Sequence, residues 1–180
     1  MCNMKQRIKQ LAIALLTLCL TLSAHAQDTQ ERVFLQIYNS AQKVANDPQE
    51  SMQARKVATF KVDAIDYMKR KTLNILTDTT QNLTNDEIAA INNRLDSMAY
   101  FMYDYVNLFT KEYSRARGKR QKQRVLNAFR EASINNPLFN DADRQLVLAY
   151  YNREDYLTQF SLDTDWVKAL ADVKEKLKKI

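Results

Sequence analysis

The chain has 180 residues and a formal net charge of +6, and both its cysteines (Cys2 and Cys19) and its one histidine (His25) lie in the first 26 residues. The rest of the chain therefore lacks the side chains that carry most nucleophilic, acid–base and transition-metal chemistry near neutral pH. Its single glycine also excludes glycine-rich phosphate-binding loops, so we expect no cofactor.

Residues 1–26 have the three parts of a secretory signal peptide. The positive start is formed by Lys5, Arg7 and Lys9. Residues 11–22 are apolar apart from two threonines, and Ala24-His25-Ala26 is a small-x-small cleavage site. We therefore expect cleavage near Ala26 and an exported product, periplasmic or secreted. An uncleaved anchor is one alternative, but residues 11–22 are too few to span a hydrocarbon core of ~30 Å.

Lipid attachment at Cys19 is a second alternative. The residue before a lipid-modified cysteine is usually small, whereas here it is Leu18. We therefore favour a soluble exported chain without a transmembrane helix, folded as a single helical domain over residues 27–180. Removing the first 26 of the 180 residues leaves 154, enough to bury roughly 70% of the unfolded surface without disulfides.

Helices are expected throughout residues 27–180. One glycine (Gly118) and two prolines leave little turn chemistry for hairpins, and no segment alternates with the period of a strand. The apolar pattern predicts six helices, at about 29–46, 48–76, 85–115, 119–134, 141–152 and 163–179. The predicted fold class is all-α, an elongated helical bundle built on a long antiparallel helix hairpin with shorter flanking helices.

Four of these helices begin at recognisable capping residues. For the second, third, fifth and last helices the predicted caps are, in turn, Asp47 before Pro48, Thr84 in a capping box with Glu87, Asn140 or Asp141, and Ser161 or Asp163.

The third helix carries an unbroken heptad seam, formed by Ile88, Ile91, Leu95, Met98, Met102, Tyr105 and Phe109. Residues beside the seam are polar before Met98 and largely apolar after it, so the second half of the helix needs several partners. The second helix has a similar length and is joined to the third by residues 77–84. This predicts an antiparallel hairpin about 43 Å long, at 1.5 Å per residue, whose tip at 68–97 projects as two helices only.

The same seam can form a coiled coil between two chains. Short loops beside only a few heptads favour packing within one chain, and an oligomer is the alternative.

The basic excess that follows the leader lies in one segment. The leader holds three of the 27 cations and no acid, so residues 27–180 carry 24 cations against 21 acids. Residues 111–130 alone hold eight cations and one acid. The candidate anion- or partner-binding cations are Arg115, Arg117, Lys119, Arg120, Lys122 and Arg124. They predict binding of a protein or an anionic envelope component, with a solvated helix start as the alternative. Nucleic acid is not expected, because aromatic residues are not interleaved with these cations and the chain is exported.

Tyr100 and Tyr103 lie opposite the seam of the third helix. We expect other helices to cover both side chains. The alternative is a partner-binding surface that the two tyrosines share with the basic segment.

Close carboxylates are the remaining candidates for chemistry, and they form the pairs Asp141 and Asp143, Glu154 and Asp155, and Asp163 and Asp165. Two of these pairs stand at predicted helix starts, where the helix dipole favours acids. No calcium-loop spacing is present, so we expect neither a metal site nor a catalytic pair. The alternative is a hydrolase that cleaves glycan with two carboxylates.

The leader ending Ala24-His25-Ala26-Gln27 and the Asn-, Tyr- and Lys-rich chain after it resemble small exported all-helical proteins of Bacteroidetes that have no assigned function. Leu83-Thr84-Asn85-Asp86-Glu87 is similar to the helix starts of the Spy/CpxP periplasmic chaperones, which are basic helical hairpins without cysteine. The L-T-x-x-Q repeat of those chaperones has Gln where this chain has Glu87. Together with the residues above, the sequence predicts an exported, non-enzymatic protein that binds a protein partner or an acidic envelope surface.

Overall fold

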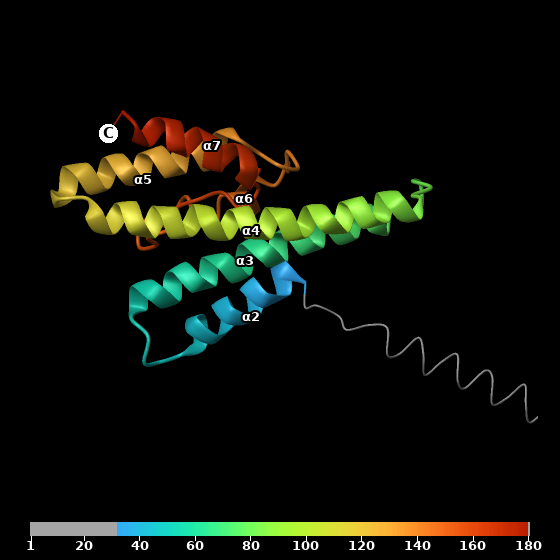
Figure 1. The fold of residues 1–180 in the computed structure, drawn as a ribbon, viewed down its shortest axis with the longest axis horizontal. Coiled ribbons are helices and arrows are strands. Elements are labelled where there is room, and N and C mark those ends of the chain that lie inside the picture. The colour runs from blue at the N-terminus through green and yellow to red at the C-terminus, as the bar shows by residue number, and fades with distance from the viewer. Residues whose placement is uncertain (1–31, 180) are drawn as a thin grey trace, which may run out of the picture. The chain divides into compact units, whose positions relative to one another are not determined.

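The computed structural model describes residues 32–179, and the chain from Val33 onward forms one compact unit (Figure 1). All regular secondary structure among the described residues is helical, which confirms the all-α fold class. The helices are α2 (Val33–Asn46), α3 (Met52–Leu76), α4 (Asn85–Arg115), α5 (Gly118–Asn135), α6 (Arg144–Val147) and α7 (Trp166–Leu177). The predicted signal peptide, both cysteines, the histidine and the first three residues of the first predicted helix lie outside the described residues.

The predicted antiparallel hairpin is formed by α3 and α4 (Figure 1). With 31 residues, α4 is about 46 Å long at 1.5 Å per residue. The predicted capping box begins it, because the Thr84 amide donates to Glu87 Oε2 at 2.8 Å and the Glu87 amide donates to Thr84 Oγ1 at 3.3 Å. These two bonds satisfy amides that a helix start otherwise leaves without an acceptor.

Helices α2, α5 and α7 pack along the hairpin, and α4 contacts all three as well as α3. In Figure 1, α2 lies beside α3, whereas α5 and α7 lie together on the other side of α4. Helix α2 runs antiparallel to α3: near one end the Tyr38 hydroxyl donates to Asp66 Oδ2 at 3.3 Å, and near the other Arg55 Nε donates to the Ala45 carbonyl at 3.1 Å.

Buried aromatic rings join the helices at the second half of α4. The Phe160 ring lies 5.5 Å from Phe60 of α3, 5.1 Å from Phe109 of α4 and 6.2 Å from Phe129 of α5. Phe160 belongs to Thr158–Trp166, nine consecutive buried residues that lead into α7 and end at its first residue. The second half of α4 therefore has partners on several sides, as the apolar flanks of its seam predict.

The starts of α3 and α7 differ from the prediction. Helix α3 begins at Met52, where Ser51 Oγ accepts from the Ala54 amide at 3.2 Å. The Asp47 side chain instead accepts from the Gln49 amide and forms a turn before the helix. Asp165 is the N-cap of α7. The predicted caps at Asp47, Ser161 and Asp163 are therefore wrong by a few residues.

The helix predicted over residues 141–152 is largely absent. Only Arg144–Val147 are helical, with Asp143 as N-cap, and turns follow. Asp141 does not start the helix, because its carboxylate accepts from Lys71 and Tyr67 of α3.

The two-helix tip is also shorter than predicted. Met68 and Leu95 are buried, and Lys71 Nζ forms an ion pair with Asp141 Oδ2 at 2.6 Å. The segment before α6 therefore covers part of the hairpin that residues 68–97 were expected to leave bare.

Candidate functional site

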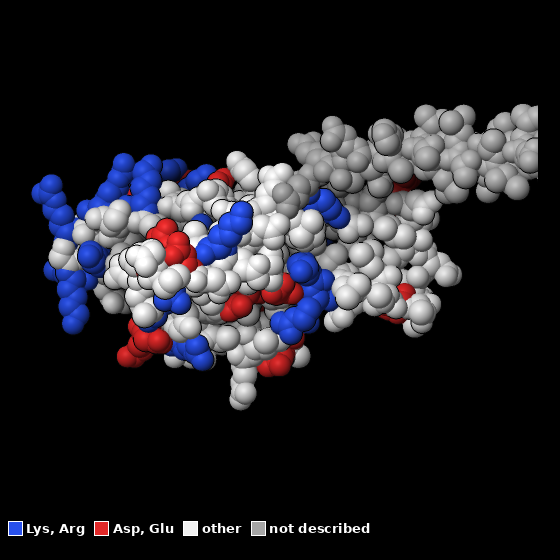
Figure 2. Space-filling view, turned by 90° about the horizontal axis from the view of Figure 1, so that it is seen from below, with Lys and Arg blue, Asp and Glu red and all other residues white. Residues whose placement is uncertain are grey.

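The predicted cations gather where α4 turns into α5, and we call this group of six residues, Arg115, Arg117, Lys119, Arg120, Lys122 and Arg124, the basic corner. Figure 2 shows Lys and Arg crowded at that end of the molecule. The turn is short, because buried Ala116 ends α4 and Gly118 already begins α5. Gly118 has φ +74°, a left-handed conformation that other residues adopt at a cost, and the chain reverses there.

Three of these arginines gather at the start of α5. Arg120 and Arg124 are four residues apart on one side of the helix, and Arg117 is the N-cap residue just before it. With Gln121 they line a shallow cavity of about 260 Å³. Lys122 lies elsewhere on the helix, with its ammonium 5.3 Å from the centre of the Tyr113 ring. The corner thus presents a cluster of guanidinium groups directed at one place.

Few acids offset this charge. Among the described residues, Arg115 alone of the six forms an ion pair, with Glu112 Oε1 at 3.4 Å, and it is exposed. The first turn of α5 contains no acid, and its N-cap residue, Arg117, makes no side-chain capping bond. The starts of α3, α4, α6 and α7 are all capped by a side-chain oxygen, from Ser51, Thr84, Asp143 and Asp165 respectively. Positive side chains therefore surround the positive end of the α5 dipole, which no N-cap side chain offsets, although Gln121 Oε1 accepts from the Arg117 amide at 2.7 Å.

Tyr100 and Tyr103 are exposed, at 51% and 41%, so the expectation that other helices cover them is wrong. The structure also does not bring them to the basic corner. Tyr103 and Arg115 are twelve residues apart on the same helix, about 18 Å at 1.5 Å per residue. The tyrosines and the corner form two separate surfaces.

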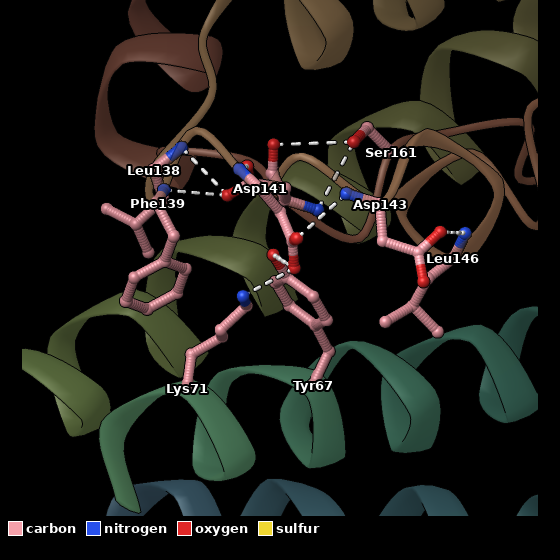
Figure 3. A network of polar contacts seen from close by, with 9 residues as sticks. Tyr67, Lys71, Leu138, Phe139, Asp141, Asp143, Leu146 and Ser161 are labelled. Carbon is pink, nitrogen blue, oxygen red and sulfur yellow. Dashed lines mark hydrogen bonds and ion pairs between the residues drawn. The ribbon is translucent and has the colours of Figure 1, made fainter. Parts of the chain in front are cut away.

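The predicted carboxylate pairs hold parts of the fold together, as Figure 3 shows for one of them. Lys71 and Tyr67 of α3 both reach the Asp141 carboxylate, Tyr67 Oη donating to Oδ2 at 3.1 Å. The hydrogen bond from Lys71 holds the pKa of Asp141 below its usual range. Burial, reinforced by nearby carboxylates, raises the pKa of Tyr67.

Asp163 has a comparable structural role. Its buried carboxylate accepts from three backbone amides, those of Leu138, Phe139 and Asp141, at 3.1, 2.7 and 2.8 Å. Three bonds of this kind satisfy the oxygens of a buried carboxylate and fix the loop before α6. Asp143 and Asp165 cap helices, and Asp155 pairs with Lys56. These contacts give five of the six predicted acids a structural role, and Glu154 is exposed.

A groove between α2, α3 and α4, with a volume of about 450 Å³, was missed at the level of sequence. Among the described residues that line it, Lys61 alone carries a charge. Lys61 Nζ donates to Asn107 Oδ1 at 3.0 Å and lies 4.5 Å from the centre of the Tyr103 ring. Burial lowers the pKa of Lys61 to about 8. A possible signal was the spacing of Ala54, Ala58 and Lys61, which puts two small residues and one cation on a single helix face.

Comparisons with known proteins gave no match among protein-family models, curated proteins or solved structures. Within residues 32–179, no three His, Cys, Asp or Glu side chains stand close enough to hold a metal ion. No helix in this described part of the chain has the length and hydropathy needed to cross a membrane.

Proposed function

We propose that this chain is an exported, non-enzymatic binding protein that holds an anionic partner, a protein surface or an envelope component, at its basic corner. The observation that carries the proposal is the cluster of arginines and lysines, almost without acidic partners, at the uncapped start of α5. Export rests on the three-part leader at residues 1–26.

An anion at the corner removes two unfavourable interactions at once. Cations near a helix N-terminus are repelled by the helix dipole, and neighbouring cations repel one another. A carboxylate, phosphate or sulfate group reverses both effects. Arginine is well suited to this contact because its planar guanidinium donates two parallel hydrogen bonds to such groups.

The position of the corner supports binding to a large partner. Its side chains extend from one end of the hairpin, and the shallow cavity between Arg117, Arg120 and Arg124 leaves them open to a surface. Most of the carboxylates that the alternative, a glycan hydrolase, would use cap helices, form ion pairs or hold a loop.

Removal of the charge tests this proposal. In the test variant, glutamine replaces Arg115, Arg117, Lys119 and Arg120. In the control variant, glutamine replaces four exposed cations on other faces, Lys43, Arg70, Arg94 and Lys174. We expect wild type and control to be retained on vesicles containing phosphatidylglycerol, or to capture a partner from an envelope extract, in a salt-dependent manner. The corner variant should lose this retention, because salt-dependent binding to a polyanion scales with the cations engaged.

Both variants lose the same net charge, so the comparison separates a site from a general effect of charge. Equal loss in the two variants, or unchanged binding in the corner variant, would overturn the proposal. Circular dichroism of both variants checks that the helices are intact.

A further inference from the structure

The groove between α2, α3 and α4 lies apart from the basic corner and has a different character. Its apolar sides come from Ile37, Ala41 and Val44 of α2 and from Ala54, Val57 and Ala58 of α3. The two helices run antiparallel, so these rows lie opposite one another along about 10 Å of helix, at 1.5 Å per residue. Small side chains in both rows keep the groove open.

Lys61 stands at one end of these rows. It follows Ala54 by seven residues, and the α4 residues Tyr103 and Asn107 face it across the groove. No described carboxylate forms an ion pair with Lys61, and no acid lines the groove. Burial of a cation without a counter-charge is unfavourable, and the lowered pKa of Lys61 reflects that cost.

We propose that this groove binds a small amphipathic carboxylate, of the medium-chain fatty acid class, with its carboxylate at Lys61 and its acyl chain between α2 and α3. The chain supplies apolar surface for two rows of apolar side chains, and the carboxylate supplies the counter-charge that Lys61 lacks. The Asn107 amide and the Tyr103 hydroxyl offer further donors at the same end.

The dimensions agree with a small ligand. A volume of about 450 Å³ falls within the range of small-molecule sites, which are mostly apolar with a few polar groups that fix orientation. An apolar side chain from a partner protein, or from a second copy of this chain, would not supply a counter-charge for Lys61. Finding such an occupant in the groove would contradict the proposal.

Calorimetric titration of the protein with octanoate, and with octanol as the uncharged control, tests this inference. We expect octanoate to bind one site per chain and octanol to bind more weakly. Lys61→Gln should weaken octanoate binding by roughly tenfold or more, the range for a hydrogen bond to a charged group, and leave octanol binding nearly unchanged.

Lys69→Gln is the matched control. Lys69 lies two turns further along α3 and also stacks on a tyrosine, 5.0 Å from the centre of the Tyr38 ring, but it is paired with Asp66 at 3.2 Å. This variant should bind octanoate like the wild type. Ala54→Leu, which narrows the groove without a change of charge, should weaken both ligands.

A second measurement does not depend on how the variants fold. In the wild type, octanoate should protect Lys61 from reductive methylation by formaldehyde, as followed by mass spectrometry, and should leave Lys69 unprotected. Absence of saturable octanoate binding, equal affinity of Lys61→Gln and wild type, or equal protection of the two lysines would each overturn the inference. None of these results bears on the basic corner, so the two proposals fail independently.

Discussion

The environment of Lys61 could not be predicted from its residue type. In the sequence it is one of several lysines within a predicted helix. In the fold its ammonium lies against the Tyr103 ring and Asn107, with apolar side chains beyond. This environment, which depends on two neighbouring helices, changes the energetics of the charge.

The lowered pKa of Lys61 predicts a specific dependence of stability on pH. Because its folded pKa, about 8, lies below its unfolded value, the unfolded chain binds more protons between these two pH values. The free energy of unfolding should therefore rise with pH above about 8, and the Lys61 contribution should amount to on the order of 1 kcal/mol between pH 7 and 9. Denaturant unfolding of wild type and Lys61→Met, at both pH values, measures this difference.

The sign is the informative part of that measurement. Lys61→Met should stabilise the protein relative to wild type at pH 7, and the advantage should shrink at pH 9. A constant difference between Lys61→Met and wild type across the range contradicts the assignment of a partly buried ammonium without an acidic partner.

At the scale of the elements, four helix starts follow one capping rule, and the start of α5 is the exception. Where Ser51, Thr84, Asp143 and Asp165 accept from backbone amides, the sequence has a short polar residue at the helix start. Helix α5 has Arg117 there. A residue that stabilises the helix poorly is expected at a position whose charge serves binding.

Arg117→Ser tests that trade-off. Arg117 already has the extended backbone of an N-cap, with φ −94° and ψ 120°, so a serine hydroxyl can accept from the first turn of α5. We expect the free energy of unfolding to increase by about 0.5–1 kcal/mol, the usual contribution of such a cap. Binding to phosphatidylglycerol vesicles should weaken in the same variant. Denaturant titration and vesicle co-sedimentation give the two readouts.

The control is Arg124→Ser, which removes the same charge from the same face within α5. It should weaken binding without the gain in stability, because serine inside a helix has no free amide to cap. If Arg117→Ser leaves stability unchanged, the start of α5 is already satisfied and the argument from its dipole is wrong.

The elements also show why part of the fold followed from the sequence. The capping box of Thr84 and Glu87 and the hairpin of α3 and α4 depend on residues near one another in the chain, and both predictions are confirmed. The helix expected over residues 141–152 is largely absent, because contacts with residues distant in the sequence decide the structure of this segment. There Asp141 binds Lys71 and Tyr67, and Tyr150 donates to Asp63, so side chains hold the segment in turns.

The candidate sites divide in the same way. The basic corner could be predicted from the sequence because its six cations lie within ten residues, so they stay close together whatever the rest of the chain does. The groove was not predicted from the sequence, because it forms only where α2, α3 and α4 pack together. Tyr103 was expected to be covered by other helices, and in the structure it is exposed with its ring beside Lys61.

Across residues 32–179, the helical unit is unevenly supported. The second half of α4 is packed by α5, α7 and the buried segment Thr158–Trp166. Toward the hairpin tip, Leu73 is 57% exposed and Ile88 38% exposed, so the two helices there have mainly each other. Local opening requires less free energy where few apolar contacts are broken.

This asymmetry predicts the pattern of amide hydrogen exchange. Amides between Met98 and Phe109 should exchange most slowly, and those in the first two turns of α4 at least about a hundredfold faster after correction for intrinsic rates. Mass spectrometry of peptides from α4 measures both halves in one helix, so helix propensity and solution conditions are shared. Equal protection along α4 would show that the tip is held as firmly as the core.

Slow exchange confined to the second half would place the basic corner on the most stable part of the described fold, since α5 packs directly on that half and on α7. A rigid backbone at the basic corner would hold the arginines in position in the unbound protein. Less conformational entropy would then be lost when the proposed partner binds.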